Sequence, residues 1–312
     1  MKIESGPAAA LLILSVLQAA ASLASAHSQP PAPNAAAAPA ESSRVRVGLA
    51  MDDARLILQP EDPPKDGVPE SQAAEEVNTG QDPTKPLARL DIRLKYQDLP
   101  GGNSAVVPTL RLDVPFALGN GGWKLGTRFD LPFAINDVPS PDNPDGDWHA
   151  GTSDALAQFL FITPPRGRWQ FAFGTQLLFP TGSEDQMGTG KWQLAPTVAG
   201  IYALPEISKG SFAGLLVKDQ FSVAGDEDRR DIHDLVIQPL FNINLPDAWF
   251  LTLAPEIRVN LEDDGDAFVP FNVQVGKMIS PKSVMSLEFK APLVDDYKQY
   301  DFEVEFRVGF FF

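Results

Sequence analysis

The side chains that could catalyse a reaction are few in this sequence of 312 residues, which contains three histidines and no cysteine. The lack of cysteine removes thiolate nucleophiles, disulfides and cysteine-ligated zinc. A serine nucleophile needs a histidine base, and His233, between Asp231 and Asp234 and downstream of Ser222, comes nearest to that pattern. Neighbouring residues of a strand point to opposite faces, so His233 and Asp234 would not orient each other. We therefore predict no catalytic residues and no enzyme.

Two other segments could bind an ion or a phosphate. Gly188–Lys191 is similar to a phosphate-binding loop, but Trp192 stands where a serine or threonine is required and Asp185 where the first glycine belongs. The acidic run Glu262–Asp266 offers oxygen ligands for calcium, yet it lacks the spacing and the distal glutamate of a dedicated loop. We predict a loop-to-strand junction and a solvated acidic loop, with no metal and no cofactor.

Charged side chains recur at every second position in four segments, near residues 87–97, 105–116, 123–134 and 300–312. Alternate residues of a strand lie on one face, so each segment presents a charged face and an apolar face. Opposite charges on facing strands stabilise their pairing. The charges could form a ladder that seals the first segment to the last, or a field that orients solutes. This candidate site comprises Arg89, Arg93, Lys95, Arg111, Asp113, Arg128, Asp130, Asp301, Glu303, Glu305 and Arg307.

The middle of the chain carries amides where the outer segments carry charges. A wall of uncharged donors and acceptors suits neutral or weakly polar solutes better than strong ions. We expect no large apolar side chain to fill the space beside this wall. The amides are Gln158, Gln170, Gln176, Gln193, Gln238 and Asn242.

The last stretch of the chain indicates how the charged face is positioned. Apolar residues occupy every second position from Tyr300 to Phe312, with charged residues between them, which is the period of a strand. The alternatives are an edge strand of a soluble sandwich and a strand of a transmembrane barrel, whose apolar face meets lipid and whose polar face lines the lumen. A terminal aromatic residue after such alternation resembles the signal that marks bacterial outer-membrane barrels for assembly, so Phe312 predicts the assembly machinery as a partner.

Similar strands recur from residue 87 onward, which predicts an all-β, antiparallel transmembrane β-barrel of about 12 strands over residues 87–312. Strands of this length match a tilted span of the hydrocarbon layer, and an even number is typical of bacterial single-chain barrels. The predicted strands lie near residues 87–97, 105–116, 123–134, 154–162, 168–179, 192–202, 212–221, 232–243, 249–260, 268–277, 283–291 and 300–312.

The connections alternate in length, as expected for short periplasmic turns and longer external loops. Those after even-numbered strands are mostly short, whereas most of those after odd-numbered strands are longer and acidic, as at 136–153 and 261–267. Trp123, Trp169 and Trp249 each follow a short turn, where an interfacial aromatic girdle is expected.

The N-terminal part has a different composition. Residues 1–26 contain a small-residue and leucine-rich run that ends in Ala24-Ser25-Ala26, a cleavage pattern that predicts a signal peptide and Sec export. Residues 27–86 are rich in proline, alanine and acids, so we predict a disordered periplasmic extension. Its apolar stretch Val45–Leu58 could fold on contact, which leaves a partial plug of the barrel as the alternative to a tether.

One segment carries a family resemblance. Phe179–Pro196 holds a Pro-Thr-Gly strand end, a short loop, and a Gly-Thr-Gly followed by an aromatic residue and a proline. It resembles the outer-membrane family named for the MetA pathway of phenol degradation, over roughly residues 87–312. The resemblance implies a transporter-like barrel that moves hydrophobic or aromatic compounds.

The function predicted from these patterns is passive passage of small solutes, hydrophobic or aromatic ones among them, through a channel in the Gram-negative outer membrane. A filled barrel that acts as a surface or scaffold protein without transport is the first alternative, and an outer-membrane lipid hydrolase is the second. Outer-membrane lipid and lipopolysaccharide are the expected surroundings. A formal net charge of −16 argues against nucleic acid as a partner.

Overall fold

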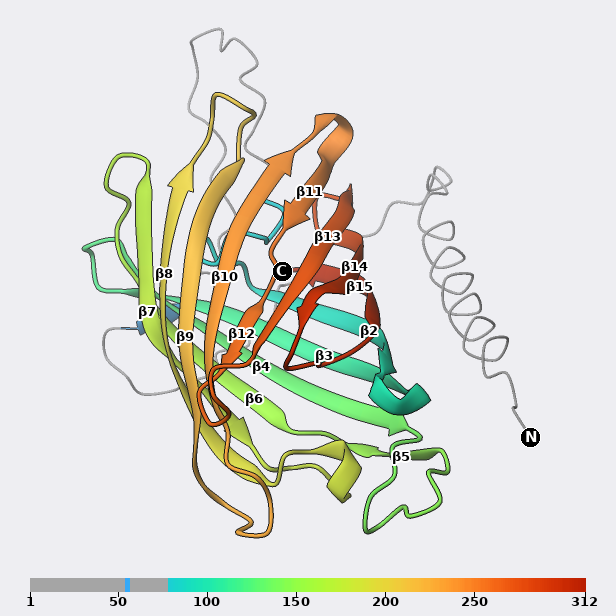
Figure 1. Cartoon of the computed structure of the whole chain (residues 1–312). Helices are drawn as coiled ribbons and strands as arrows, with labels where there is room; N and C mark the ends of the chain where they lie inside the picture. The colour runs from blue at the N-terminus through green and yellow to red at the C-terminus, as the bar shows by residue number, and fades with distance from the viewer. Residues whose placement is uncertain (1–53, 57–77) are drawn as a thin grey trace, which may run out of the picture. The chain divides into compact units, whose positions relative to one another are not determined.

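The computed structural model of the protein describes residues 54–56 and 78–312. Within them the chain forms one closed antiparallel sheet that curls into a barrel (Figure 1). Among these residues no helix is long and apolar enough to cross a membrane. The strands are β1 (Ala54–Leu56), β2 (Arg89–Leu99), β3 (Asn103–Leu118), β4 (Trp123–Asn136), β5 (His149–Thr152), β6 (Ala155–Ile162), β7 (Trp169–Phe179), β8 (Lys191–Ala203), β9 (Phe212–Gly225), β10 (His233–Asn244), β11 (Trp249–Leu253), β12 (Ile257–Asn260), β13 (Ala267–Ser280), β14 (Ser283–Asp295) and β15 (Phe302–Phe311).

The prediction of a twelve-stranded barrel is confirmed. Strands β5 and β6 both pair with β4 and make one span, and β11 and β12 together make another between β10 and β13. With the short β1 set aside, twelve spans follow one another around the barrel. Short 3-10 turns lie at Pro100–Gly102 (η1), Asp185–Met187 (η2) and Pro246–Ala248 (η3).

The barrel closes where its last strand meets its first. Strand β15 pairs with β2 from Phe302 opposite Asp98 to Phe311 opposite Arg89. Closure leaves no free sheet edge, as a spanning sheet requires, since lipid offers no partner for backbone polar groups. The predicted adjacency of the first and last strands is therefore correct.

One span is interrupted at Pro255, which has no backbone N–H to donate. Side chains replace the missing ladder contacts there. The backbone N–H of Ala254 donates to Asn272 Oδ1 (2.8 Å), and Gln238 Nε2 donates to the Ala254 carbonyl (3.1 Å). The register with β10 and with β13 is the same on both sides of the break, so Glu256 shares the inward phase of Thr252 and Arg258 and lines the barrel cavity.

The outer surface is apolar. Trp123, Trp169 and Trp249 are exposed at the strand starts that follow the shorter connections, as an interfacial girdle requires. The ring of Trp169 stacks on Phe171 with centroids 5.8 Å apart. The outward, exposed side chains of the wall include Ile92, Leu110, Leu112, Phe129, Leu131, Phe133, Phe173, Val198, Leu215, Phe271, Val275, Leu287, Phe289 and Phe310. This exterior is the one expected of a barrel embedded in hydrocarbon.

The alternation of the last strand starts later than the sequence indicated. Strand β15 begins at Phe302, so Tyr300 is not lipid-facing: it is 7% exposed, lines the cavity and packs edge-on against Phe268 with ring centroids 4.9 Å apart. Asp301 lies in the preceding connection, where it pairs with Lys298 instead of joining the charges of the inner face. Both residues precede the point at which pairing with β2 fixes which side faces inward.

Residues 78–88 form a segment of turns that leads into β2. Residues 78–86 of this segment belong to the range 27–86 that the sequence predicts as a disordered extension. Asn78 holds the turn by accepting from the Gly80 N–H (2.9 Å), and Asp82 accepts from both the N–H and the hydroxyl of Thr84. Gly80 has a φ of +71°, a backbone conformation that favours glycine. Gly80, Gln81 and Pro83 line the cavity inside the barrel.

Most of the predicted N-terminal features lie outside the described residues. These are the signal peptide, residues 27–53 and residues 57–77. Of the apolar stretch Val45–Leu58, only Ala54–Leu56 is described, and it forms β1 against the end of β3.

Deletion of Phe312 is expected to lower the yield of heat-modifiable, membrane-inserted barrel. The residue supplies the terminal aromatic side chain, and its N–H ties the chain end to the Ala88 carbonyl (3.1 Å). Membrane fractions would be compared by gel mobility with and without heating. Phe271→Ala, which removes another exposed aromatic ring but leaves the chain end intact, is the control. Equal yields of the truncated and full-length chains would show that Phe312 is not an assembly signal.

Candidate functional site

The interior of the barrel contains a cavity of about 690 Å³. This volume lies in the range of pockets that hold small molecules, about 300–1,000 Å³. Nearly every span contributes to its wall, because alternate residues of each strand point inward. Nine of the predicted site residues line the cavity: Arg89, Arg93, Lys95, Arg111, Arg128, Asp130, Glu303, Glu305 and Arg307.

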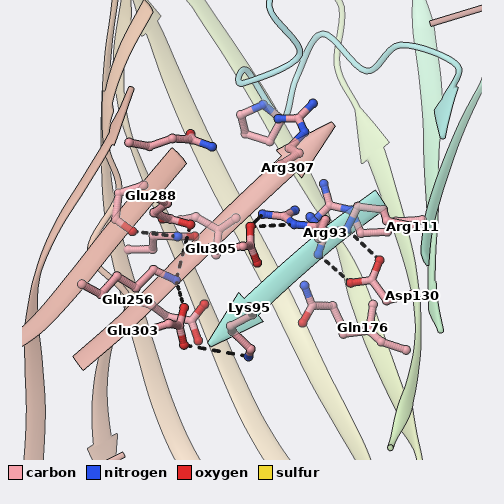
Figure 2. Close-up of a pocket in the computed structure, with 18 of the residues that line it drawn as sticks. Arg93, Lys95, Arg111, Asp130, Gln176, Glu256, Glu288, Glu303, Glu305 and Arg307 are labelled. Carbon is pink, nitrogen blue, oxygen red and sulfur yellow. Dashed lines mark hydrogen bonds and ion pairs between the residues drawn. The ribbon is translucent and has the colours of Figure 1, made fainter. Parts of the chain in front are cut away.

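The charges on one part of the wall are matched in pairs (Figure 2). Arg111 makes two hydrogen bonds to Asp130, from Nε to Oδ1 (2.7 Å) and from Nη2 to Oδ2 (2.6 Å). Asp113, which was also predicted, accepts from Arg89 Nε (2.8 Å) on one side and from Arg128 Nε (2.9 Å) on the other. Such charge-assisted bonds fix both partners in one geometry.

A second set of charges crosses the closing seam. Arg93 on β2 donates from Nε to Glu305 Oε1 on β15 (2.8 Å). Glu303 accepts from Lys290 Nζ (2.8 Å) on the neighbouring strand β14, and the Nζ of Lys95 lies 3.9 Å from it. These contacts have the geometry of the charge ladder predicted from the sequence, in which opposite charges join the first and last strands.

The wall also holds charges that the sequence reasoning did not select. Glu256 lies between Lys218 (3.4 Å) and Arg258, and Arg258 also pairs with Asp234 (3.2 Å). Lys290 lies 3.7 Å from Glu288. The signal that could have found them is the same alternation, which continues across Pro255 with Thr252, Glu256 and Arg258 on one face. The missed cavity-lining charges are Lys218, Glu256, Arg258, Glu288 and Lys290.

Amides form a ladder on the other part of the wall. Gln176 donates to Gln158 (2.7 Å), and Gln220 donates to Gln193 (2.6 Å). Gln238 also lines the cavity. Asn242 is fully buried and accepts from Thr252 (2.8 Å). Gln170 donates to the Thr163 carbonyl near the turn that precedes β7 (3.0 Å).

Large apolar side chains also occupy this wall, so the expectation that none would do so is wrong. A cluster of buried apolar residues runs across β6 to β10, toward the end of the barrel where the shorter turns lie. Alternation identifies the inward positions, but it does not show which inward apolar side chains lie close enough to pack together. The cluster contains Leu160, Ile162, Ala172, Ala199, Ile201, Phe212, Leu216 and Leu240, and Leu160, Leu216 and Leu240 line the cavity.

The Gly-Thr-Gly segment is held by one carboxylate. Asp154 accepts from the N–H of Gly182 (3.1 Å) and from both the N–H (2.7 Å) and the hydroxyl (2.7 Å) of Thr189. A side chain on Gly182 would come within 2.8 Å of the Gly188 backbone, so these two loop residues can approach so closely only as glycines. Lys191 binds Asp231 (2.9 Å). The segment is a loop-to-strand junction, as predicted.

Ser222, His233 and the neighbouring aspartates, which a lipid hydrolase would use, are not arranged as a catalytic triad. His233 Nε2 pairs with Asp219 (3.0 Å), whereas the Ser222 hydroxyl donates to Asp231 (3.2 Å). In residues 54–56 and 78–312 no group of three or more histidine, aspartate or glutamate side chains has the geometry to hold a metal ion.

Comparison with known proteins identifies the fold alone. No protein-family model and no curated protein matches the chain. The COG4313 outer membrane channel from Pseudomonas putida F1 superposes with a TM-score of 0.57 at 14% identity, over 78% of this chain and 100% of that one. The NanC porin gives a TM-score of 0.48 at 11% identity (72% and 98% covered), and the KdgM porin 0.42 at 10% (72% and 99%). The fold is that of outer-membrane channel barrels, and the resemblance to the MetA-pathway family stays a prediction.

Replacement of Asp154 by alanine is expected to release the loop of residues 180–190 without unfolding the barrel. Three hydrogen bonds to one charged acceptor are lost, and each such bond contributes about 1.5–3 kcal/mol. A glutamate-specific protease should then cut at Glu184 at least about tenfold faster, the factor that corresponds to about 1.4 kcal/mol. Asp145→Ala, at an exposed position of the neighbouring loop, is the control. Unchanged cleavage would contradict the anchoring role.

Proposed function

We propose that this protein is an outer-membrane channel that lets small solutes pass without an energy source. The observation that carries the proposal is a polar cavity of about 690 Å³ enclosed by a barrel whose outer face is apolar. A wall built only for stability would gain more from apolar filling than from buried ion pairs, whose desolvation offsets much of their attraction. The superposable Pseudomonas putida protein carries the name of a channel, which agrees with this role.

The solutes we propose are small molecules with an apolar body and a hydrogen-bonding group. Most charges of the wall are matched locally, as in Arg111 with Asp130 and Arg93 with Glu305, so they present dipoles more than a strong net field. The amide ladder offers uncharged donors and acceptors, and Leu160, Leu216 and Leu240 offer apolar contact in the same cavity. These features agree with the hydrophobic or aromatic compounds implied by the family resemblance.

We further propose that residues 78–86 act as a partial plug of this path. Arg89 Nη1 donates to the Gly80 carbonyl (2.6 Å), and Gly80, Gln81 and Pro83 face the cavity. The position of this segment before β2 places it at the barrel end with the shorter turns. We also propose that residues 1–26 direct Sec export. The acidic connections at the opposite end of the barrel would then face lipopolysaccharide.

The second candidate is a barrel that serves as a surface or scaffold protein without transport. The apolar cluster of β6 to β10 favours it, because buried Ile162, Ile201 and Phe212 narrow one part of the interior. Solute flux separates the two candidates.

The double variant Glu303→Gln/Glu305→Gln is expected to shift the ion selectivity of the channel toward anions. Arg93 and Lys95 lose their carboxylate partners and Lys290 keeps only Glu288, so the wall gains net positive charge. The reversal potential in planar bilayers under a salt gradient measures the shift. Melting in detergent should also fall, because breaking a buried pair costs about 3–5 kcal/mol.

The control is Glu206→Gln, which removes an exposed carboxylate that pairs with Arg168 at a turn. It should leave the reversal potential unchanged. Liposome swelling with a neutral sugar tests passage itself. A wild-type protein that inserts but neither conducts nor permits swelling would overturn the channel and favour the scaffold.

A further inference from the structure

Five guanidinium groups gather on the inner wall of β2, β3, β4 and β15. We call Arg89, Arg93, Arg111, Arg128 and Arg307 the arginine cluster. Arg307 lies directly opposite Arg93 in the register of β15 with β2, and like charges in facing positions destabilise a strand pair. Four carboxylates contact the cluster, so it holds one more positive than negative charge; they are Asp91, Asp113, Asp130 and Glu305.

Arg307 differs from the other four in its contacts. Each of the others donates a hydrogen bond to a carboxylate. Arg307 has only an ion pair with Asp91 (Nε to Oδ2, 3.0 Å), and within the described part of the chain its Nε and Nη2 have no aligned hydrogen-bond partner. Its side chain is 3% exposed. A buried guanidinium whose Nε and Nη2 make no hydrogen bond is costly and calls for an explanation.

The position of Arg307 supplies that explanation. Its side chain lines the cavity and lies above the row of ion pairs in the view of Figure 2. Arg89, which could otherwise compete for an incoming anion, is bound to Asp113 and to the Gly80 carbonyl. Among the described residues, Arg307 is therefore the one guanidinium of the cluster that lines the cavity without a hydrogen bond to a carboxylate.

We propose that Arg307 binds the carboxylate of a small organic monoacid inside the barrel. A single negative charge balances the surplus of the arginine cluster, and a planar carboxylate matches the donor fork of a guanidinium. The apolar body of the acid lies against the leucines that line the same cavity, Leu160, Leu216 and Leu240. This deepens the proposed channel function, since the acid must enter through the barrel.

Titration calorimetry of the purified full-length barrel with benzoate tests the proposal. Benzyl alcohol, with the same ring and no charge, and chloride at equal ionic strength are the matched ligands. Saturable binding of benzoate is expected, with at least about tenfold weaker binding of benzyl alcohol and no displacement by chloride. Absence of saturable benzoate binding, or equal binding of benzyl alcohol, overturns the site.

The double variant Arg307→Gln/Asp91→Asn removes both members of the ion pair, so neither is left charged without the other, and Arg89, which lies 3.5 Å from Asp91, keeps its hydrogen bond to Asp113. Its Kd for benzoate should rise at least about tenfold, while Arg168→Gln at an exposed turn should bind as the wild type does. Gel mobility checks that each variant is folded. If the double variant does not fold, Arg307→Lys keeps the charge but loses the fork, and severalfold weaker binding is expected. An unchanged Kd in the folded variant overturns the assignment.

The bilayer measurement keeps this proposal separate from the channel itself. A barrel that conducts but does not bind benzoate retains its channel function and loses the carboxylate site. A barrel that binds benzoate through Arg307 but never conducts retains the site and loses the channel.

Discussion

The pairing of β15 with β2 is the constraint on which the rest of this molecule depends. Backbone groups in hydrocarbon must find partners within the protein, so an open sheet could not span the membrane. Ten residues of the last strand meet the first strand in register. That register also fixes which side of β15 faces inward. It brings Glu305 to Arg93 across 212 positions of sequence.

Once the barrel is closed, the polar halves of the strands face one another in a confined space. Charged groups there cannot all reach bulk water, so they must satisfy each other. Asp113 shared between Arg89 and Arg128, and Glu256 between Lys218 and Arg258, are such solutions. Not every group is satisfied: Arg307, on the cavity wall, keeps Nε and Nη2 without a hydrogen-bond partner among the described residues.

The interior of the barrel is partly filled. Apolar residues of β6 to β10 and the segment that carries Gly80 narrow it, whereas ion pairs and amides keep the remaining wall polar. The cavity that results is of the size of a small-molecule pocket.

The sequence by itself determined the number of spans, their antiparallel order and the lipid-facing residues, because the alternation of apolar and polar residues follows directly from strand geometry. It also placed Arg93, Arg111, Asp130 and Glu305 on polar faces. It did not determine the phase at Tyr300 and Asp301 or the turns of residues 78–86. The phase at Tyr300 and Asp301 depends on where pairing with β2 begins, and the turns of residues 78–86 depend on contacts with the closed barrel, such as that of Gly80 with Arg89.

Only the tertiary structure decided which charged residues form ion pairs with one another. Periodicity assigns a residue to a face, but partners across a barrel depend on strand register and stagger, which a two-residue period does not encode. Arg307 and Arg93 look equivalent in the sequence, since both alternate with apolar neighbours. In the closed barrel Arg93 reaches Glu305, while Arg307 faces Arg93 and keeps donors without a partner among the described residues.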